Sequence, residues 1–151
     1  MPPRVYVTRR FHFSAAHRVY NPAWSDEKNY EVFGPCSHPG FHGHNYELEV
    51  TVAGAPNPDT GYVLDLALLK KLIDSHLIAQ LDHKNLNTDV PFLSGQIPST
   101  ENLIVALWKE IQRLLPPGVK LVRLRLQETP RNAFEYYGEE DPLPPAQHQT
   151  L

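Results

Sequence analysis

The sequence predicts an α+β domain in which two helices cover one face of a four-stranded antiparallel sheet. Two long segments near the N-terminus alternate between apolar and polar residues, two central segments have helical periodicity, and two more alternating segments follow. Alternation with a period of two is typical of a half-buried strand, whereas apolar residues three or four apart are typical of an amphipathic helix. The predicted order is therefore ββααββ, within a single domain that spans residues 1–138.

The first predicted strand spans residues 5–17. The residues that share its apolar phase are Val5, Val7, Phe11, Phe13, Ala15 and His17. Since successive side chains point to opposite faces of a strand, His17 lies with the hydrophobic residues, whereas His12 is expected at the surface. Arg9 interrupts the apolar phase, which indicates either a bulge or an exposed strand edge.

A long insertion, residues 18–41, separates the first strand from the second. Residues 25–33 begin with a serine suited to be an N-cap and with an acidic first turn, which predicts a short helix. The next stretch, residues 34–40, contains glycine and proline and is not expected to form regular structure. It also contains Cys36, the only cysteine, which is either a small buried hydrophobic residue or a working thiol.

The second predicted strand, residues 41–52, begins with His42 and His44 on its apolar face. Two imidazoles at i and i+2 are close enough to bind one ion, and a divalent metal offsets the cost of burying them without partners. The alternative is two core histidines that each make a hydrogen bond. If the first two strands form an antiparallel hairpin, the end of the first meets the start of the second. His17 then completes a site of three histidines.

The central segments predict two helices. Asp65 is the expected N-cap of a helix that ends near Leu81. The second helix begins at Ser99 or Thr100, where Glu101 suits the positive end of the helix dipole, and it ends at a proline pair.

Two shorter strands are predicted at residues 120–128 and 133–137. In the first of them, Val122, Leu124 and Leu126 share one face, and Glu128 falls on the same apolar phase. A buried carboxylate needs a partner, which is either an ion-pairing side chain or a ligand that is cationic or rich in N–H groups. From residue 139 the chain is rich in proline and has no periodicity, so residues 139–151 are expected to form a flexible tail.

The overall charge and the single cysteine limit the possible partners. A net charge of −3 and a pI near 6.2 give no reason to expect binding to nucleic acid or to a membrane surface. No apolar run is long enough to span a bilayer, and the N-terminus lacks the apolar core of a signal peptide. One cysteine cannot form an internal disulfide, so a cytoplasmic location is expected.

Five motifs, in their order along the chain, resemble the 6-pyruvoyltetrahydropterin synthase / 6-carboxytetrahydropterin synthase family. They are Phe13–His17, Cys36 with His42–Tyr46, Leu81–Leu86, Ser99–Asn102, and Glu128 with Thr129. The resemblance covers roughly residues 5–139. It implies a tunnelling fold, in which three subunits join their sheets into a barrel and two such trimers stack into a hexamer. A closed barrel would remove the exposed edges that a four-stranded sheet otherwise has.

The resemblance also implies a substrate, 7,8-dihydroneopterin triphosphate, and roles for nine residues. These are the zinc ligands His17, His42 and His44, the catalytic residues Cys36, Asp82 and His83, and the substrate-binding residues Glu128, Glu101 and Thr100. Cys36 would be the general base, and Asp82 would orient His83, which helps to activate the thiol or relays its proton. Glu128 would anchor the pterin, in a pocket between subunits.

Two branches of this family share that substrate. The pyruvoyl branch eliminates triphosphate and rearranges the side chain towards tetrahydrobiopterin, whereas the carboxy branch also loses acetaldehyde and supplies deazaguanine (queuosine) synthesis. The long loop around Cys36 and the stretch Asp82–Pro91 look closer to the pyruvoyl branch. His38 departs from the expected loop and is either a surface residue or a second proton acceptor. A third alternative, a non-catalytic zinc-containing pterin-binding module, has no use for a base such as Cys36.

Overall fold

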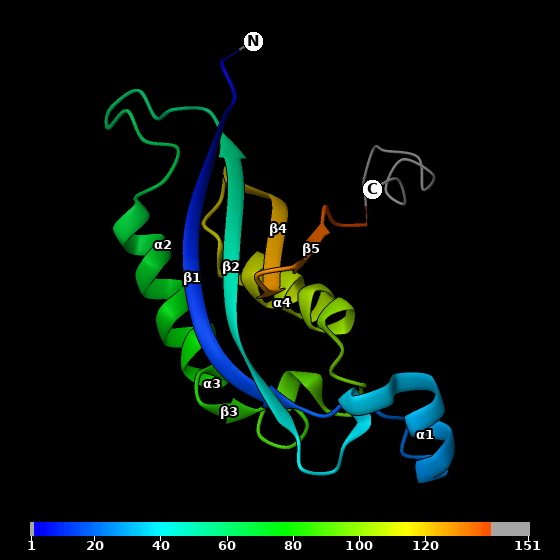
Figure 1. Ribbon diagram of the computed structural model, residues 1–151. Helices are drawn as coiled ribbons and strands as arrows, with labels where there is room; N and C mark the ends of the chain where they lie inside the picture. The colour runs from blue at the N-terminus through cyan, green and yellow to red at the C-terminus, as the bar shows by residue number, and fades with distance from the viewer. Residues whose placement is uncertain (1, 140–151) are drawn as a thin grey trace.

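A computed structural model describes residues 2–139 of the chain. It contains one mixed sheet with helices packed on one face, and the short helix of residues 26–33 lies beyond the end of the sheet (Figure 1). The strand order is β3-β1-β2-β4-β5. The strands are β1 (Val5–His17), β2 (His42–Gly54), β3 (Lys84–Asn85), β4 (Lys120–Thr129) and β5 (Asn132–Tyr136). The four long strands are antiparallel neighbours, as predicted, and the short β3 adds a parallel pairing to the end of β1. The proposed tail, residues 139–151, falls outside the described residues except for Glu139.

The β1–β2 hairpin is the longest feature of the sheet. Its register runs without interruption from Val5 opposite Gly54 to His17 opposite His42. The alternation predicted from the sequence is visible in the burial, since Phe11 and Phe13 are buried whereas His12 is exposed. No bulge interrupts β1 at Arg9. β3 pairs only with the last part of β1, so Arg9 lies on an exposed edge of the sheet within one chain, which was the other possibility.

A bulge does occur between β2 and β4, where the register shifts between Thr51 and Val52. Its effect is that Leu121, rather than Val122, is buried at the start of β4, so the predicted alternation holds only from Leu124 onwards. Bulges insert one residue into a strand and exchange the faces of the residues before it.

The helices begin where capping side chains favour them. They are α1 (Asp26–Phe33), α2 (Leu66–Ile73), α3 (Ala79–Leu81) and α4 (Thr100–Leu114). Ser25, Asp65 and Ser99 are the N-caps of α1, α2 and α4, and each side chain accepts a hydrogen bond from a backbone N–H in the first turn of its helix, whereas α3 has no side-chain cap. A π-helical turn, η2 (Asp74–Ile78), joins α2 to α3, so the predicted helix to Leu81 is one helical run with an extra residue in its middle.

Two 3₁₀ turns complete the structure, η1 (Gly34–Ser37) and η3 (Pro91–Leu93). The first corrects the expectation that residues 34–40 have no regular structure. Gly34 has a φ of 62°, in the left-handed region that favours glycine, and it ends α1 so that the chain can turn into η1.

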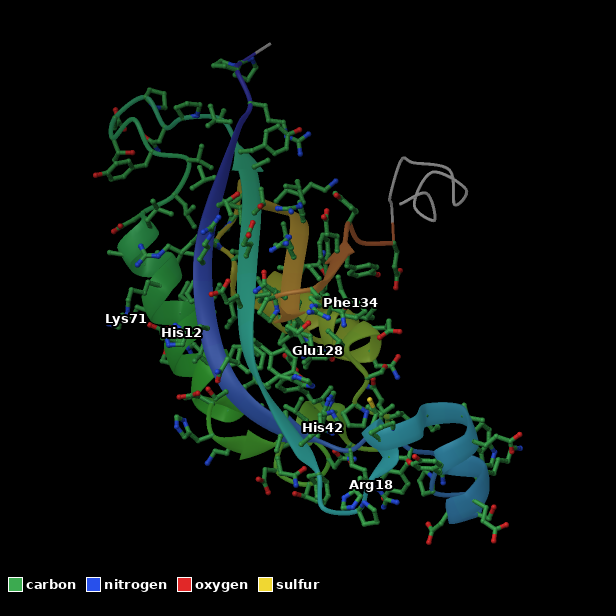
Figure 2. The ribbon with its side chains drawn as sticks, in the orientation of Figure 1. His12, Arg18, His42, Lys71, Glu128 and Phe134 are labelled. Carbon is green, nitrogen blue, oxygen red and sulfur yellow. The ribbon has the colours of Figure 1, made fainter. Side chains whose placement is uncertain are left out.

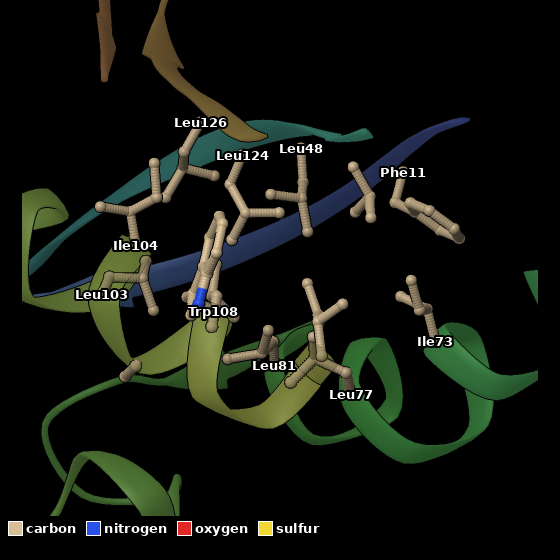
Figure 3. Packing of buried hydrophobic residues seen from close by; sticks show 14 of the residues in the cluster. Phe11, Leu48, Ile73, Leu77, Leu81, Leu103, Ile104, Trp108, Leu124 and Leu126 are labelled. Carbon is tan, nitrogen blue, oxygen red and sulfur yellow. The ribbon is translucent and has the colours of Figure 1, made fainter. Parts of the chain in front are cut away.

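The core lies between the sheet and the helices α2, α3 and α4 (Figure 3). Leu48 and Leu124 from the sheet, Leu77 and Leu81 from the α2–α3 run, and Leu103 from α4 have no measurable solvent exposure. This single apolar layer packs the sheet against the helices and so fixes the position of β1 and β2 relative to the start of α4. Across residues 2–139, no helix is both long and apolar enough to traverse a lipid bilayer.

Candidate active site

Three histidines meet where β1 ends and β2 begins. His17 and His42 are direct partners in the antiparallel register, and His44 lies two residues further along the same face. Each of the three offers a ring nitrogen within 4.8 Å of the others, and among the described residues this is the one such group of potential metal ligands. The predicted three-histidine cluster is therefore present, at the end of the sheet that Figure 2 marks with His42.

The backbone at the start of α4 fixes the orientation of His17. Nδ1 of His17 lies 2.8 Å from the carbonyl oxygen of Pro98, and the His17 side chain is buried. A carbonyl oxygen only accepts, so Nδ1 carries the proton and donates it, which leaves Nε2 free to bind an ion. Sequence analysis did not find Pro98, because a backbone carbonyl leaves no signal in the pattern of side chains.

Burial keeps these imidazoles in the form that binds metals. Desolvation lowers the pKa of His17, His42 and His44 below the usual 6.5, and this effect outweighs the carboxylate of Glu128, which acts to raise all three. Neutral imidazole is the ligand form, so the cluster is ready for a divalent cation near neutral pH. Three histidines with no fourth protein ligand among the described residues fit a zinc-type site that keeps one position open.

Glu128, at the end of β4, is a carboxylate whose charge acts on the pKa of all three histidines. Figure 2 places it on β4 above His42. Thr100, buried in the first turn of α4, donates its hydroxyl hydrogen to the Glu128 carboxylate. Among residues 2–139, no lysine or arginine forms an ion pair with Glu128. The ion-pair alternative is therefore not supported for Glu128. Each carboxylate oxygen can accept more than one hydrogen bond, so both oxygens can still accept from a ligand with N–H groups.

Tyr46 is a further aromatic residue of the site, on the same strand face as the histidines. Its ring stacks on Phe13 at a centroid distance of 4.9 Å and meets His44 edge-on at 5.6 Å. Burial and, second, the charge of Glu128 raise the pKa of the phenol, so it stays neutral. Tyr46 thus packs against the histidine cluster and adds no charge to it.

Cys36 lies in η1, and its side chain is exposed in the single chain. The backbone N–H of Val19 donates to the carbonyl oxygen of Cys36 at 2.8 Å, which holds the turn beside the residues that follow His17. Cys36 is not a member of the metal-ligand cluster. It is also not a small buried hydrophobic residue, so the first of the two interpretations of this cysteine is wrong.

Asp82 and His83 form a pair at the outer edge of β1. One carboxylate oxygen of Asp82 accepts from the backbone N–H of Ser14 at 2.8 Å, and the other lies 2.9 Å from Nδ1 of His83. The Ser14 bond, followed by the His83 contacts, lowers the pKa of Asp82. His83 has a φ of 61°, and its side chain is 82% exposed, so it points into open space in the single chain. Like Cys36, the pair lies outside the metal-ligand cluster.

The comparisons with known proteins show the family of this chain. The family model described as 6-pyruvoyl tetrahydropterin synthase matches residues 6–139. A 6-pyruvoyl tetrahydrobiopterin synthase from Pongo abelii is 47% identical over 133 residues, covering 88% of this chain and 91% of that protein. The human protein of the same name is 46% identical over 133 residues, covering 88% and 91% respectively.

A solved structure extends the agreement to the fold. The structure of Caenorhabditis elegans 6-pyruvoyl tetrahydropterin synthase superimposes with a TM-score of 0.85 at 36% identity, covering 91% of this chain and 98% of that one. Sequence motifs, fold and site therefore lead to the same assignment. The chain belongs to the 6-pyruvoyl tetrahydropterin synthase family.

Proposed function

We propose that this protein is a zinc-dependent 6-pyruvoyltetrahydropterin synthase of the cytoplasm, a lyase that eliminates triphosphate from 7,8-dihydroneopterin triphosphate. The observation that carries the proposal is the cluster of three neutral imidazoles that lies beside a carboxylate free of ion-pair partners among the described residues. The relatives at 46% and 47% identity bear the name of this activity, which favours the pyruvoyl branch over the carboxy branch.

The reaction needs no external oxidant or reductant. The hydroxyl-bearing carbons of the side chain become carbonyl carbons, triphosphate leaves from the terminal carbon, and the dihydropterin ring gains the hydrogens that make it tetrahydropterin. The protein therefore has to remove and return protons and to hold the substrate still while it does so. Bound zinc would supply Lewis acidity at the side-chain hydroxyls, and His17, His42 and His44 would hold it.

Glu128 would hold the pterin ring. Its two oxygens match two adjacent N–H donors, the 2-amino group and the neighbouring ring N–H, in a bidentate contact. Thr100 fixes one of these oxygens through its hydrogen bond, which reduces the number of orientations the carboxylate can take. Glu101 is exposed in the next position of α4 and would lie at the rim of the same pocket.

Cys36, Asp82 and His83 would move the protons. The Asp82 carboxylate is placed to hold His83 in one ring orientation, and His83 would pass a proton to or from the thiol of Cys36. Cys36 and His83 are both exposed in one chain, so a neighbouring subunit is needed to exclude water from them. The open sheet edges at β1 and β5 are compatible with a trimeric barrel and a hexamer of two trimers.

The test is a product analysis of the purified protein with 7,8-dihydroneopterin triphosphate. The proposal predicts release of triphosphate, a product with the mass of 6-pyruvoyltetrahydropterin, and no acetaldehyde. Acetaldehyde release would move the protein to the carboxy branch. Binding of the pterin without release of triphosphate would make it a non-catalytic module and refute the proposed activity.

A further inference from the structure

Arg18 directly follows the metal-ligand candidate His17, and its backbone is hydrogen-bonded to a loop that is distant in sequence. Its N–H donates to Oδ1 of Asn87 at 2.8 Å, and its carbonyl oxygen accepts from Nδ2 of Asn87 at 2.9 Å. One residue earlier in that loop, the N–H of Leu86 donates to the carbonyl oxygen of Ala16 at 2.8 Å. The loop that follows Asp82 and His83 is thereby fixed to the end of β1.

The side chain of Arg18 reaches in the other direction, to the turn that carries Cys36. Nε donates to the carbonyl oxygen of Ser37 at 2.7 Å, and the guanidinium carbon lies 3.7 Å from the centre of the Tyr20 ring. The side chain is only 14% exposed, and its acidic neighbour Asp26, at 3.9 Å, is 95% exposed. A contact with so exposed a carboxylate adds little, so the hydrogen bond and the ring contact hold the guanidinium.

The turn η1 is therefore attached to residues 18 and 19 at two successive carbonyl groups. Val19 N–H holds the carbonyl of Cys36, and Arg18 Nε holds the carbonyl of Ser37. Figure 2 shows Arg18 between the end of the sheet and α1, which is where such a link has to lie. Without the guanidinium, the Ser37 carbonyl loses its donor and the turn keeps one attachment to this segment.

We propose that Arg18 is a positioning residue, which sets the place of the Cys36 thiol relative to the histidine cluster and to the loop that follows Asp82 and His83. The inference rests on the proposed function for its catalytic consequence. The geometry itself needs only the contacts of Arg18, because the residue adjoins a metal-ligand candidate, bonds the thiol turn and is bonded by the loop after the acid–base pair.

The planar, forked shape of the guanidinium is needed to hold these contacts, and positive charge alone does not suffice. Arginine presents planar N–H donors that can bond a carbonyl while the same plane stacks on an aromatic ring, whereas the ammonium of lysine is a point charge on a flexible stem. Arg18→Lys is therefore expected to fail nearly as much as Arg18→Gln. The matched control is Arg113→Gln, because Arg113 is 71% exposed on α4 and, within residues 2–139, pairs only with Glu110 of the same helix.

The experiment compares these three variants with the wild type in kcat, KM, zinc content and the rate at which iodoacetamide alkylates Cys36. We expect kcat to fall by about 10²-fold in Arg18→Gln and Arg18→Lys, because displacing a reacting group by about 1 Å costs about that much in rate. KM and zinc content stay near wild type, and the alkylation rate changes in both Arg18 variants but not in Arg113→Gln. Tyr20→Leu, which removes only the stacking surface, gives the same pattern with a smaller loss and serves if the Arg18 variants do not fold.

Three outcomes overturn the inference: wild-type kcat and alkylation in Arg18→Gln, full recovery in Arg18→Lys, or a loss of kcat that is matched by loss of zinc. If the wild type releases no triphosphate, the proposed function fails. The alkylation rates and the zinc content still decide in that case whether Arg18 places the thiol.

Discussion

The histidine cluster and the proposed acid–base residues are held in place in different ways. His17, His42 and His44 lie on paired strands, share one face of the sheet and are held by a continuous register and by the carbonyl of Pro98. Cys36 and His83 lie on turns, are exposed, and are held through their backbone or through a single neighbouring side chain. All three candidate metal ligands thus come from one chain, whereas Cys36 and His83, the proposed acid–base residues, are exposed in a single chain.

This difference suggests which properties each region controls. Substitutions in the cluster change what the chain can bind by itself, whereas substitutions in the turns change catalysis and leave metal binding intact. The predictions below test that separation, beginning with the largest expected effect.

His42→Ala removes one of the three candidate ligands from the cluster, so we expect the variant to lose zinc binding and, with it, the proposed activity. Zinc content by mass spectrometry and triphosphate release are measured together. His12→Ala is the control, because His12 lies on β1 but on the opposite, exposed face. Full zinc content in His42→Ala would show that the cluster does not hold the metal.

Cys36→Ala removes the proposed base and leaves the cluster unchanged. We expect triphosphate release to slow by about 10²–10⁴-fold, the usual contribution of a positioned acid or base, with normal zinc content. His38→Ala separates the alternative of a second proton acceptor in the same loop, and we expect it to retain wild-type rates. Normal turnover in Cys36→Ala would refute the proposed role of the thiol.

Thr100→Val removes the hydrogen bond to the Glu128 carboxylate without changing the shape of the side chain. A hydrogen bond to a charged group contributes about 1.5–3 kcal/mol, so a pterin ligand is expected to bind about 10- to 100-fold more weakly. Calorimetry with a pterin measures the change, and Thr60→Val in a distant exposed loop is the control. If the pterin binds Thr100→Val as tightly as wild type, Glu128 does not depend on Thr100.

The smallest effect concerns the metal-free protein at mildly acidic pH. The three histidines have a lowered pKa in the folded chain, so below about pH 6.5 the unfolded chain binds more protons than the folded one. The free energy of unfolding should therefore decrease as the pH falls from 7.5 to 5.5. Urea titrations in a chelator measure this slope, which should be shallower in His17→Leu. A stability that rises towards pH 5.5 in the wild type would contradict the burial of these imidazoles.

The sequence predicted best what depends on periodicity. The meeting of His17 with His42 followed from two alternating strands joined as a hairpin, and the N-caps Ser25, Asp65 and Ser99 followed from residue type. Both signals are local, because the residues that form the strand or the cap are themselves the residues that make up the sequence pattern.

The remaining features depend on contacts between distant segments. The two-residue strand β3 is too short to alternate, and the bulge at Val122 shows only when β4 is paired with β2. The contacts of Arg18 with Asn87 and Ser37 join three separate loops through backbone groups. Sequence reasoning gave Arg18 no role, although a charged residue directly after a metal-ligand candidate was a signal that could have pointed to it.

The measurement that tests the central claim most directly is X-ray absorption at the zinc edge of the metal-loaded protein. The account predicts three imidazole nitrogens at about 2.0–2.1 Å, a fourth ligand atom lighter than sulfur, and no sulfur. A sulfur scatterer at about 2.3 Å would make Cys36 a metal ligand rather than a base, and fewer than three imidazoles would break the cluster of His17, His42 and His44.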